Sequence, residues 1–102
     1  MELLFVYGTL YEPEVQLRLI GRLLDSHPDT LRGYERTSHL LPPYPVAMPD
    51  ENKEIDGYVL QVTPEELAQF DIYETDDYQR IRVTLDSGTE AWVYIGNPAR
   101  FS

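Results

Sequence analysis

The first stretch that could do chemistry is Tyr7-Gly8-Thr9-Leu10, which directly follows the apolar run Leu3 to Tyr7. A glycine at the end of a strand lets the backbone pass close to a ligand. Consecutive N–H groups in such a turn point into one concavity, which is a suitable site for a carboxylate. The four residues are therefore candidate binding residues, and an ordinary strand-to-loop turn is the alternative interpretation.

The second stretch runs from Phe70 to Arg80 and places Glu74 among aromatic side chains. A carboxylate near the C-terminus of a helix lies at the unfavourable end of the helix dipole. Apolar neighbours and the dipole would both raise its pKa, as general acid–base catalysis requires. Tyr78 and Arg80 share the polar face of the strand that follows. On spacing alone, a solvated glutamate at a helix end is the favoured interpretation of Glu74. Arg80 could equally be a partner in a structural salt bridge.

Other kinds of site find no support in the residue types. The chain has no cysteine, which excludes a thiolate nucleophile, a thiolate metal site and a disulfide. His27 and His39 have no partner at metal-ligand spacing, and no metalloprotease or serine-hydrolase motif is present. We therefore expect neither a metal nor a cofactor.

The net charge of the chain limits the kinds of partner that it could bind. The 102 residues carry 18 acidic and 8 basic side chains, a formal charge of -10. This balance argues against nucleic acid and against an anionic membrane surface as partners. No apolar run approaches the roughly 20 residues of a membrane span, and no signal-peptide pattern precedes Leu3. We expect a small acidic protein of the cytosol, folded as one domain over residues 1–102.

The elements that must position these residues can be read from the patterns along the chain. Residues 3–7 suit a strand covered on both faces, and residues 14–24 suit a helix that begins at Pro13. Residues 30–38 are a plausible strand. The segment from 41 to 50 carries four prolines, so it should be neither an ordinary helix nor a central strand.

The second half of the chain gives clearer signals. Residues 55–62 alternate as a strand, and Thr63-Pro64-Glu65-Glu66 has the residues of a helix start with a capping box. Residues 78–85 alternate cleanly, and a turn at 86–88 leads to a last strand at 91–95. Five to six strands with about two helices predict an α+β domain with a mostly antiparallel or mixed sheet.

Several short motifs occur in an order that is typical of a known family. They are Tyr7-Gly8-Thr9-Leu10, Glu12 to Val15, Tyr44 to Ala47, Ile55 to Leu60, Phe70 to Glu74 and Tyr78 to Arg80. In these residues the chain resembles the γ-glutamylcyclotransferase-like superfamily, and in particular the branch named after a plant avirulence-induced protein. The match covers roughly residues 5–83. It implies a small mixed, partly closed β-barrel-like sheet.

The resemblance also implies an activity. Family members cyclise a γ-glutamyl amine or amino acid to 5-oxoproline and release the amine, without a metal or cofactor. It implies that Tyr7 to Leu10 line the pocket, that Glu74 is the acid/base, and that Tyr78 and Arg80 match the residues that follow it. A non-enzymatic binding or regulatory domain, or a pure interaction module, remains the alternative.

Two departures from the family pattern concern the candidate site. Thr75 stands where many members have a glycine after the glutamate. Tyr11 and Glu12 stand where many have a glycine and a basic residue. The first could change how Glu74 is presented, and the second could change which substrate fits.

Overall fold

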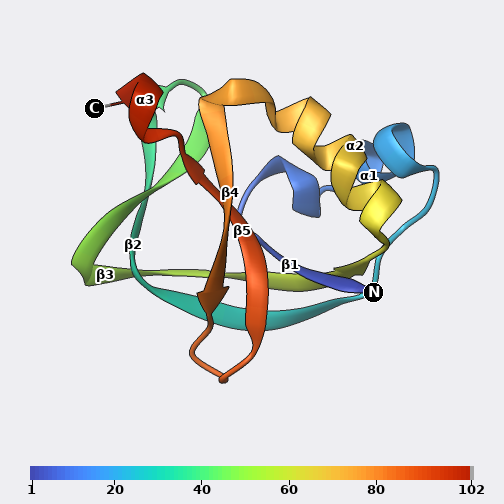
Figure 1. The fold of residues 1–102 in the computed structure, drawn as a ribbon, viewed down its shortest axis with the longest axis horizontal. Coiled ribbons are helices and arrows are strands. Elements are labelled where there is room, and N and C mark those ends of the chain that lie inside the picture. The colour runs from blue at the N-terminus through green and yellow to red at the C-terminus, as the bar shows by residue number, and fades with distance from the viewer. Residues whose placement is uncertain (102) are drawn as a thin grey trace.

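A five-stranded mixed sheet forms the centre of the molecule in a computed structural model that describes residues 1–101 (Figure 1). The strands are β1 (Glu2–Val6), β2 (Ser26–Leu41), β3 (Tyr44–Val62), β4 (Tyr78–Thr84) and β5 (Glu90–Gly96). The main helices are α1 (Pro13–Ile20) and α2 (Pro64–Glu74), and the short ones are η1 (Thr9–Tyr11), η2 (Thr75–Asp77) and α3 (Pro98–Phe101). The predicted α+β class is confirmed.

The sheet is open. Its strand order is β2-β3-β1-β5-β4, so β2 and β4 are its two edges and do not pair with each other. The small mixed sheet that the resemblance implied is confirmed, and it is not closed into a barrel. Long, curved β2 and β3 wrap around one side of the molecule and give it a barrel-like outline without closing it (Figure 1).

Strand β1 is the central strand of the sheet. It runs antiparallel to β3 and parallel to β5. Leu4 and Val6 enter one cluster of buried side chains, and Phe5, between them, enters the other. Both faces of β1 are therefore covered, as its continuous apolar sequence predicted.

Helices α1 and α2 lie together over one face of the sheet (Figure 1). Helix α2 begins with the predicted capping box, in which the Thr63 hydroxyl accepts from the Glu66 N–H and the Glu66 carboxylate accepts from the Thr63 N–H. Helix α1 is shorter than predicted, because Gly21 adopts a φ of 74° and ends it. Arg22 then pairs with Glu66 at 2.6 Å and joins the two helices.

The proline-rich segment is the first part of β3. Residues Val46 to Pro49 pair with β2, whereas β1 pairs only with residues from Tyr58 onward. Pro45 and Pro49 thus lie where β3 has one hydrogen-bonded neighbour, a position that tolerates a missing N–H. The sequence correctly excluded a central position but did not reveal that this segment is a strand.

Candidate functional site

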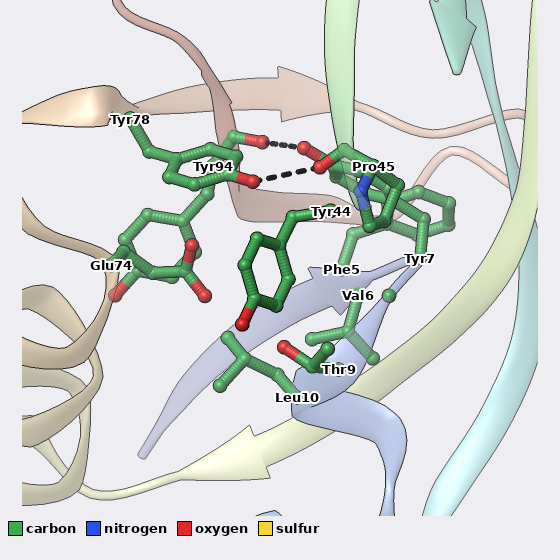
Figure 2. A pocket seen from close by; sticks show the side chains of 11 residues that line it. Phe5, Val6, Tyr7, Thr9, Leu10, Tyr44, Pro45, Glu74, Tyr78 and Tyr94 are labelled. Carbon is green, nitrogen blue, oxygen red and sulfur yellow. Dashed lines mark hydrogen bonds between the residues drawn. The ribbon is translucent and has the colours of Figure 1, made fainter. Parts of the chain in front are cut away.

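Glu74 and the Tyr7–Leu10 stretch meet at one cavity of about 30 Å³ (Figure 2). Glu74 enters from the end of α2, and Thr9 and Leu10 lie on the other side, after β1. The walls come from every strand except β2. The lining residues are Phe5, Val6, Tyr7, Gly8, Thr9, Leu10, Tyr44, Pro45, Glu74, Tyr78 and Tyr94.

The Glu74 carboxylate lies in surroundings that disfavour its charge. Burial raises its pKa from the ordinary 4.5 to about 7. No hydrogen bond or cation within residues 1–101 offsets this effect, since desolvation is its only cause. Glu74 can therefore both accept and give up a proton near neutral pH, which is what an acid/base catalyst needs.

The turn after β1 presents free backbone donors. The N–H groups of Tyr11 and Glu12 bond to the carbonyls of Gly8 and Thr9, as in a 3₁₀ turn. The N–H groups of Gly8, Thr9 and Leu10 take part in no such bond within residues 1–101. Gly8 is needed for close approach, because a Cβ there would lie 2.7 Å from Pro45 Cγ.

Two tyrosine hydroxyls in the cavity wall form hydrogen bonds with backbone groups. The Tyr7 hydroxyl donates to the Tyr94 carbonyl and accepts from the Ala47 N–H at 3.1 Å. The Tyr78 hydroxyl donates to the Pro45 carbonyl at 2.8 Å (Figure 2). Burial raises the pKa of Tyr7 and of Tyr78, so both phenols stay protonated and keep donating. These two tyrosines shape the cavity.

Arg80 does not line this cavity. Its Nε and a terminal nitrogen contact the two carboxylate oxygens of Asp71 at 2.9 and 3.0 Å. Its guanidinium also lies 4.3 Å from the centre of the Trp92 ring. Of the two alternatives that the sequence left open for Arg80, the structure places it in a salt bridge.

Sequence reasoning missed Tyr94 and Arg36. Tyr94 lies on β5, is 5% exposed and contributes both its ring and its carbonyl to the cavity wall. Its position in a strand of buried apolar residues gave no signal beyond a core role. The Arg36 Nε donates to the Tyr7 carbonyl at 2.9 Å and lines an adjoining groove of about 360 Å³.

The positions that depart from the family pattern both lie beside the cavity. Thr75 follows Glu74 with a φ of 61° and a ψ of -166°, a conformation that favours glycine. Tyr11 and Glu12 line the adjoining groove, where the Tyr11 ring stacks on Tyr58 at 4.0 Å. Thr75 therefore carries backbone strain where a glycine would carry little.

Within residues 1–101, the side chains and helices indicate neither a metal site nor a membrane span. No group of three or more acidic, histidine or cysteine side chains is arranged to hold a metal ion. None of the helices in this part of the chain combines the length and apolar character needed to cross a membrane.

Known proteins resemble the chain along most of its length. Protein AIG2 C from Arabidopsis thaliana is 36% identical over 82 residues, which are 79% of this chain and 50% of that protein. AIG2-like protein C from the same plant is 38% identical over 83 residues, or 80% and 48% of the two chains. The chain thus spans about half the length of the curated relatives that it matches.

Solved structures share the fold. The solution structure of another Arabidopsis thaliana protein superimposes with a TM-score of 0.82 and 27% identity, over 99% of this chain and 74% of that one. A protein named gamma-glutamyl cyclotransferase superimposes with a TM-score of 0.74 and 17% identity, over 93% and 66%. The second likeness shows the fold alone.

The match between the sequence and a family model identifies the family. Residues 4–101 match the family described as "Gamma-glutamyl cyclotransferase, AIG2-like". This range includes the cavity, Glu74 and the turn at Gly8. The chain therefore belongs to the AIG2-like gamma-glutamyl cyclotransferase family.

Proposed function

We propose that this protein cyclises a γ-glutamyl amine or γ-glutamyl amino acid to 5-oxoproline and releases the amine. The observation that carries the proposal is the partly buried carboxylate of Glu74, which shares one small cavity with the turn at Gly8, Thr9 and Leu10. In this reaction the α-amine of the substrate attacks its own γ-carbonyl. Because nucleophile and electrophile belong to one molecule, the protein's task is to fold the substrate and move a proton.

Glu74 is the group that moves the proton. A substrate α-ammonium has a pKa near 8, and burial raises the pKa of Glu74 to about 7. The remaining gap of about one pKa unit costs only about 1.4 kcal/mol, against about 5 kcal/mol for an ordinary glutamate. Glu74 takes one proton from the ammonium and passes it to the leaving nitrogen as the bond between that nitrogen and the γ-carbon breaks. The attacking nitrogen, now bonded to the γ-carbon, gives its second proton to Glu74. The released amine then takes this proton, which returns Glu74 to its starting carboxylate.

The turn after β1 is the electrostatic partner of this step. Attack on the γ-carbonyl places negative charge on its oxygen, and preorganised N–H donors stabilise such charge. Gly8, Thr9 and Leu10 offer three N–H groups beside the cavity. They can bind either this oxygen or the α-carboxylate of the substrate. With a charge of -10 on the chain, such local donors must supply the attraction for an anionic substrate.

Tyr44 lines both the cavity and a wider hollow outside it. About 30 Å³ is room for roughly two water molecules, far less than a γ-glutamyl group needs. Tyr44 is 49% exposed and also lines an outer hollow of about 220 Å³ that shares Thr9, Glu74 and Tyr78 with the cavity. Rotation of the Tyr44 ring would join the two spaces, and we infer that the substrate enters there.

The test is 5-oxoproline release from a panel of γ-glutamyl amines and amino acids. Glu74→Gln is expected to lower kcat at least 100-fold, since general acid–base catalysis contributes about 10²- to 10⁴-fold. Glu65→Gln, at an exposed glutamate on the same helix, is the matched control and should keep full activity. A folded Glu74→Gln protein with wild-type turnover would refute the assignment.

A binding domain without turnover is the second candidate, and the small volume of the cavity is the observation that favours it. Calorimetry of the wild-type protein with the same γ-glutamyl panel separates the two. Heat of binding without 5-oxoproline indicates the binding domain, and product formation indicates the enzyme.

A further inference from the structure

Arg80 and Asp71, which do not line the cavity, form a continuous chain of contacts with Tyr94, which does. Arg80 donates hydrogen bonds to both oxygens of the Asp71 carboxylate, at 2.9 and 3.0 Å. One of those oxygens, Oδ1, also accepts a hydrogen bond from the Tyr94 hydroxyl at 2.7 Å. Bidentate arginine–carboxylate contacts fix the geometry of both partners. The orientation of Asp71, and with it that of the phenol, is thus set from β4.

Tyr94 connects the Arg80–Asp71 pair to the cavity. Its ring lines the cavity wall, and its own carbonyl accepts the hydrogen bond from Tyr7. Tyr94 is thereby anchored at its phenol by Asp71 and at its backbone by Tyr7. Its pKa is raised by burial and by the hydrogen bond to Asp71, so the phenol stays a donor at neutral pH.

Asp71 and Glu74 lie three residues apart on α2, which places them on neighbouring positions of one helix face. An unpaired Asp71 carboxylate would therefore repel charge on Glu74. Arg80, of opposite sign and in direct contact with Asp71, cancels that charge.

We propose that Arg80 and Asp71 are positioning residues, which fix the Tyr94 wall of the cavity and neutralise each other beside Glu74. The proposal deepens, and rests on, the proposed cyclotransferase function. The other ionisable groups around Glu74 come from several elements. The strands and the turn after β1 contribute Tyr7, Tyr44, Tyr78 and Tyr94. Asp77 lines the outer hollow, and Arg18 of α1 lies over the Tyr73 ring at 5.8 Å.

The test removes the charges of Arg80 and Asp71, singly and together, and measures the pKa of Glu74 in each variant. The side-chain carboxyl of Glu74 is titrated by carbon NMR in the unliganded protein, so the result does not depend on turnover. Arg80→Met is expected to raise the pKa of Glu74 by about half a unit or more, because it leaves the Asp71 charge uncompensated. Asp71→Asn should lower it, because it leaves the Arg80 charge uncompensated. The double variant should return close to wild type.

Arg82→Met is the matched control, since Arg82 lies over the same Trp92 ring at 5.1 Å. It should leave the titration unchanged. Arg80→Lys keeps the charge and loses the bidentate grip, so it should restore the Glu74 titration while Tyr94 ring signals still shift. If the Arg80→Met protein does not fold, Asp71→Asn decides the sign.

Equal titrations in wild type, Arg80→Met and Asp71→Asn would overturn the proposal. If turnover is present in the wild type, the acidic limb of its pH profile should move with the NMR titration. If the titration responds as expected but no γ-glutamyl compound is turned over, the positioning pair stands and the cyclotransferase proposal fails.

Discussion

The Tyr7 hydroxyl donates a hydrogen bond to the backbone carbonyl of Tyr94, across 87 residues of sequence. The same hydroxyl accepts the N–H of Ala47 at 3.1 Å. One phenol oxygen thus joins the end of β1 to both β5 and the proline-rich start of β3. Because each of these three segments contributes residues to the cavity wall, the shape of the cavity depends on this oxygen.

Tyr7→Phe is therefore expected to lower stability. It leaves a buried carbonyl and a buried N–H without their partner, at a cost of about 2 kcal/mol in the free energy of unfolding. Urea denaturation measures the effect. Tyr34→Phe removes a hydroxyl from a partly buried ring that lacks this pair of bonds, and should change stability much less. Equal losses in the two variants would contradict the structural role of the Tyr7 hydroxyl.

Glu74→Gln is expected to stabilise the protein in a pH-dependent way. Burial raises the pKa of Glu74 from 4.5 to about 7, so the folded state binds its proton more tightly than the unfolded state. Below pH 4.5 the side chain is neutral in both states. As pH rises through 7, the folded protein loses stability because it must hold a buried charge.

The Glu74→Gln protein cannot ionise at this position, so it does not lose stability as the pH rises. Above pH 7 its free energy of unfolding should exceed that of wild type by about 2 kcal/mol, allowing for partial exposure of the site. At pH 4 the two proteins should be nearly equal. Denaturation curves at both pH values, with Glu65→Gln as control, measure the difference. A gain that is the same at both pH values would contradict a raised pKa.

The parts of the fold and site that could be predicted are those set by neighbouring residues. The capping box fixed the start of α2 at Pro64, and the aromatic bracket singled out Glu74. The apolar run ending at Gly8 indicated β1 and its turn. In each case the signal and the structure lie within about one turn or one strand, where local propensity and periodicity decide.

The remaining features depend on pairing between distant segments. The chain of contacts from Arg80 through Asp71 to Tyr94 links two strands and a helix, and nothing in the spacing of these residues reveals it. Whether the sheet closes depends on strand order, which alternation does not encode. The β-structure of the segment that contains Pro45 and Pro49 was hidden because proline lacks the N–H that a strand normally uses.

Gly8→Ala is expected to damage the cavity. The new Cβ would lie 2.7 Å from Pro45 Cγ. The carbonyl of Pro45 accepts a hydrogen bond from the Tyr78 hydroxyl, which holds this residue in place. Relieving such overpacking costs about 1–3 kcal/mol and displaces the turn that carries the free N–H groups. The double variant Gly8→Ala with Pro45→Ala removes the ring and should recover most of the stability. An unchanged melting temperature in the single variant would refute the close approach.

Thr75→Gly is expected to stabilise the protein. Thr75 has a φ of 61° and a ψ of -166°, a region that costs a non-glycine residue about 1–3 kcal/mol. Glycine adopts it freely but gives up about 0.5–1 kcal/mol in unfolded-state entropy, so the net gain should be about 1 kcal/mol.

The matched control is Thr84→Gly on β4, where no positive φ occurs and glycine should destabilise. Opposite signs for the two threonines, measured by urea denaturation, would show that the strain is local to the residue after Glu74. A loss of stability in Thr75→Gly similar to that of Thr84→Gly would contradict it. Because the strained residue immediately follows Glu74, relief of the strain should also alter the Glu74 titration, which the same NMR measurement would detect.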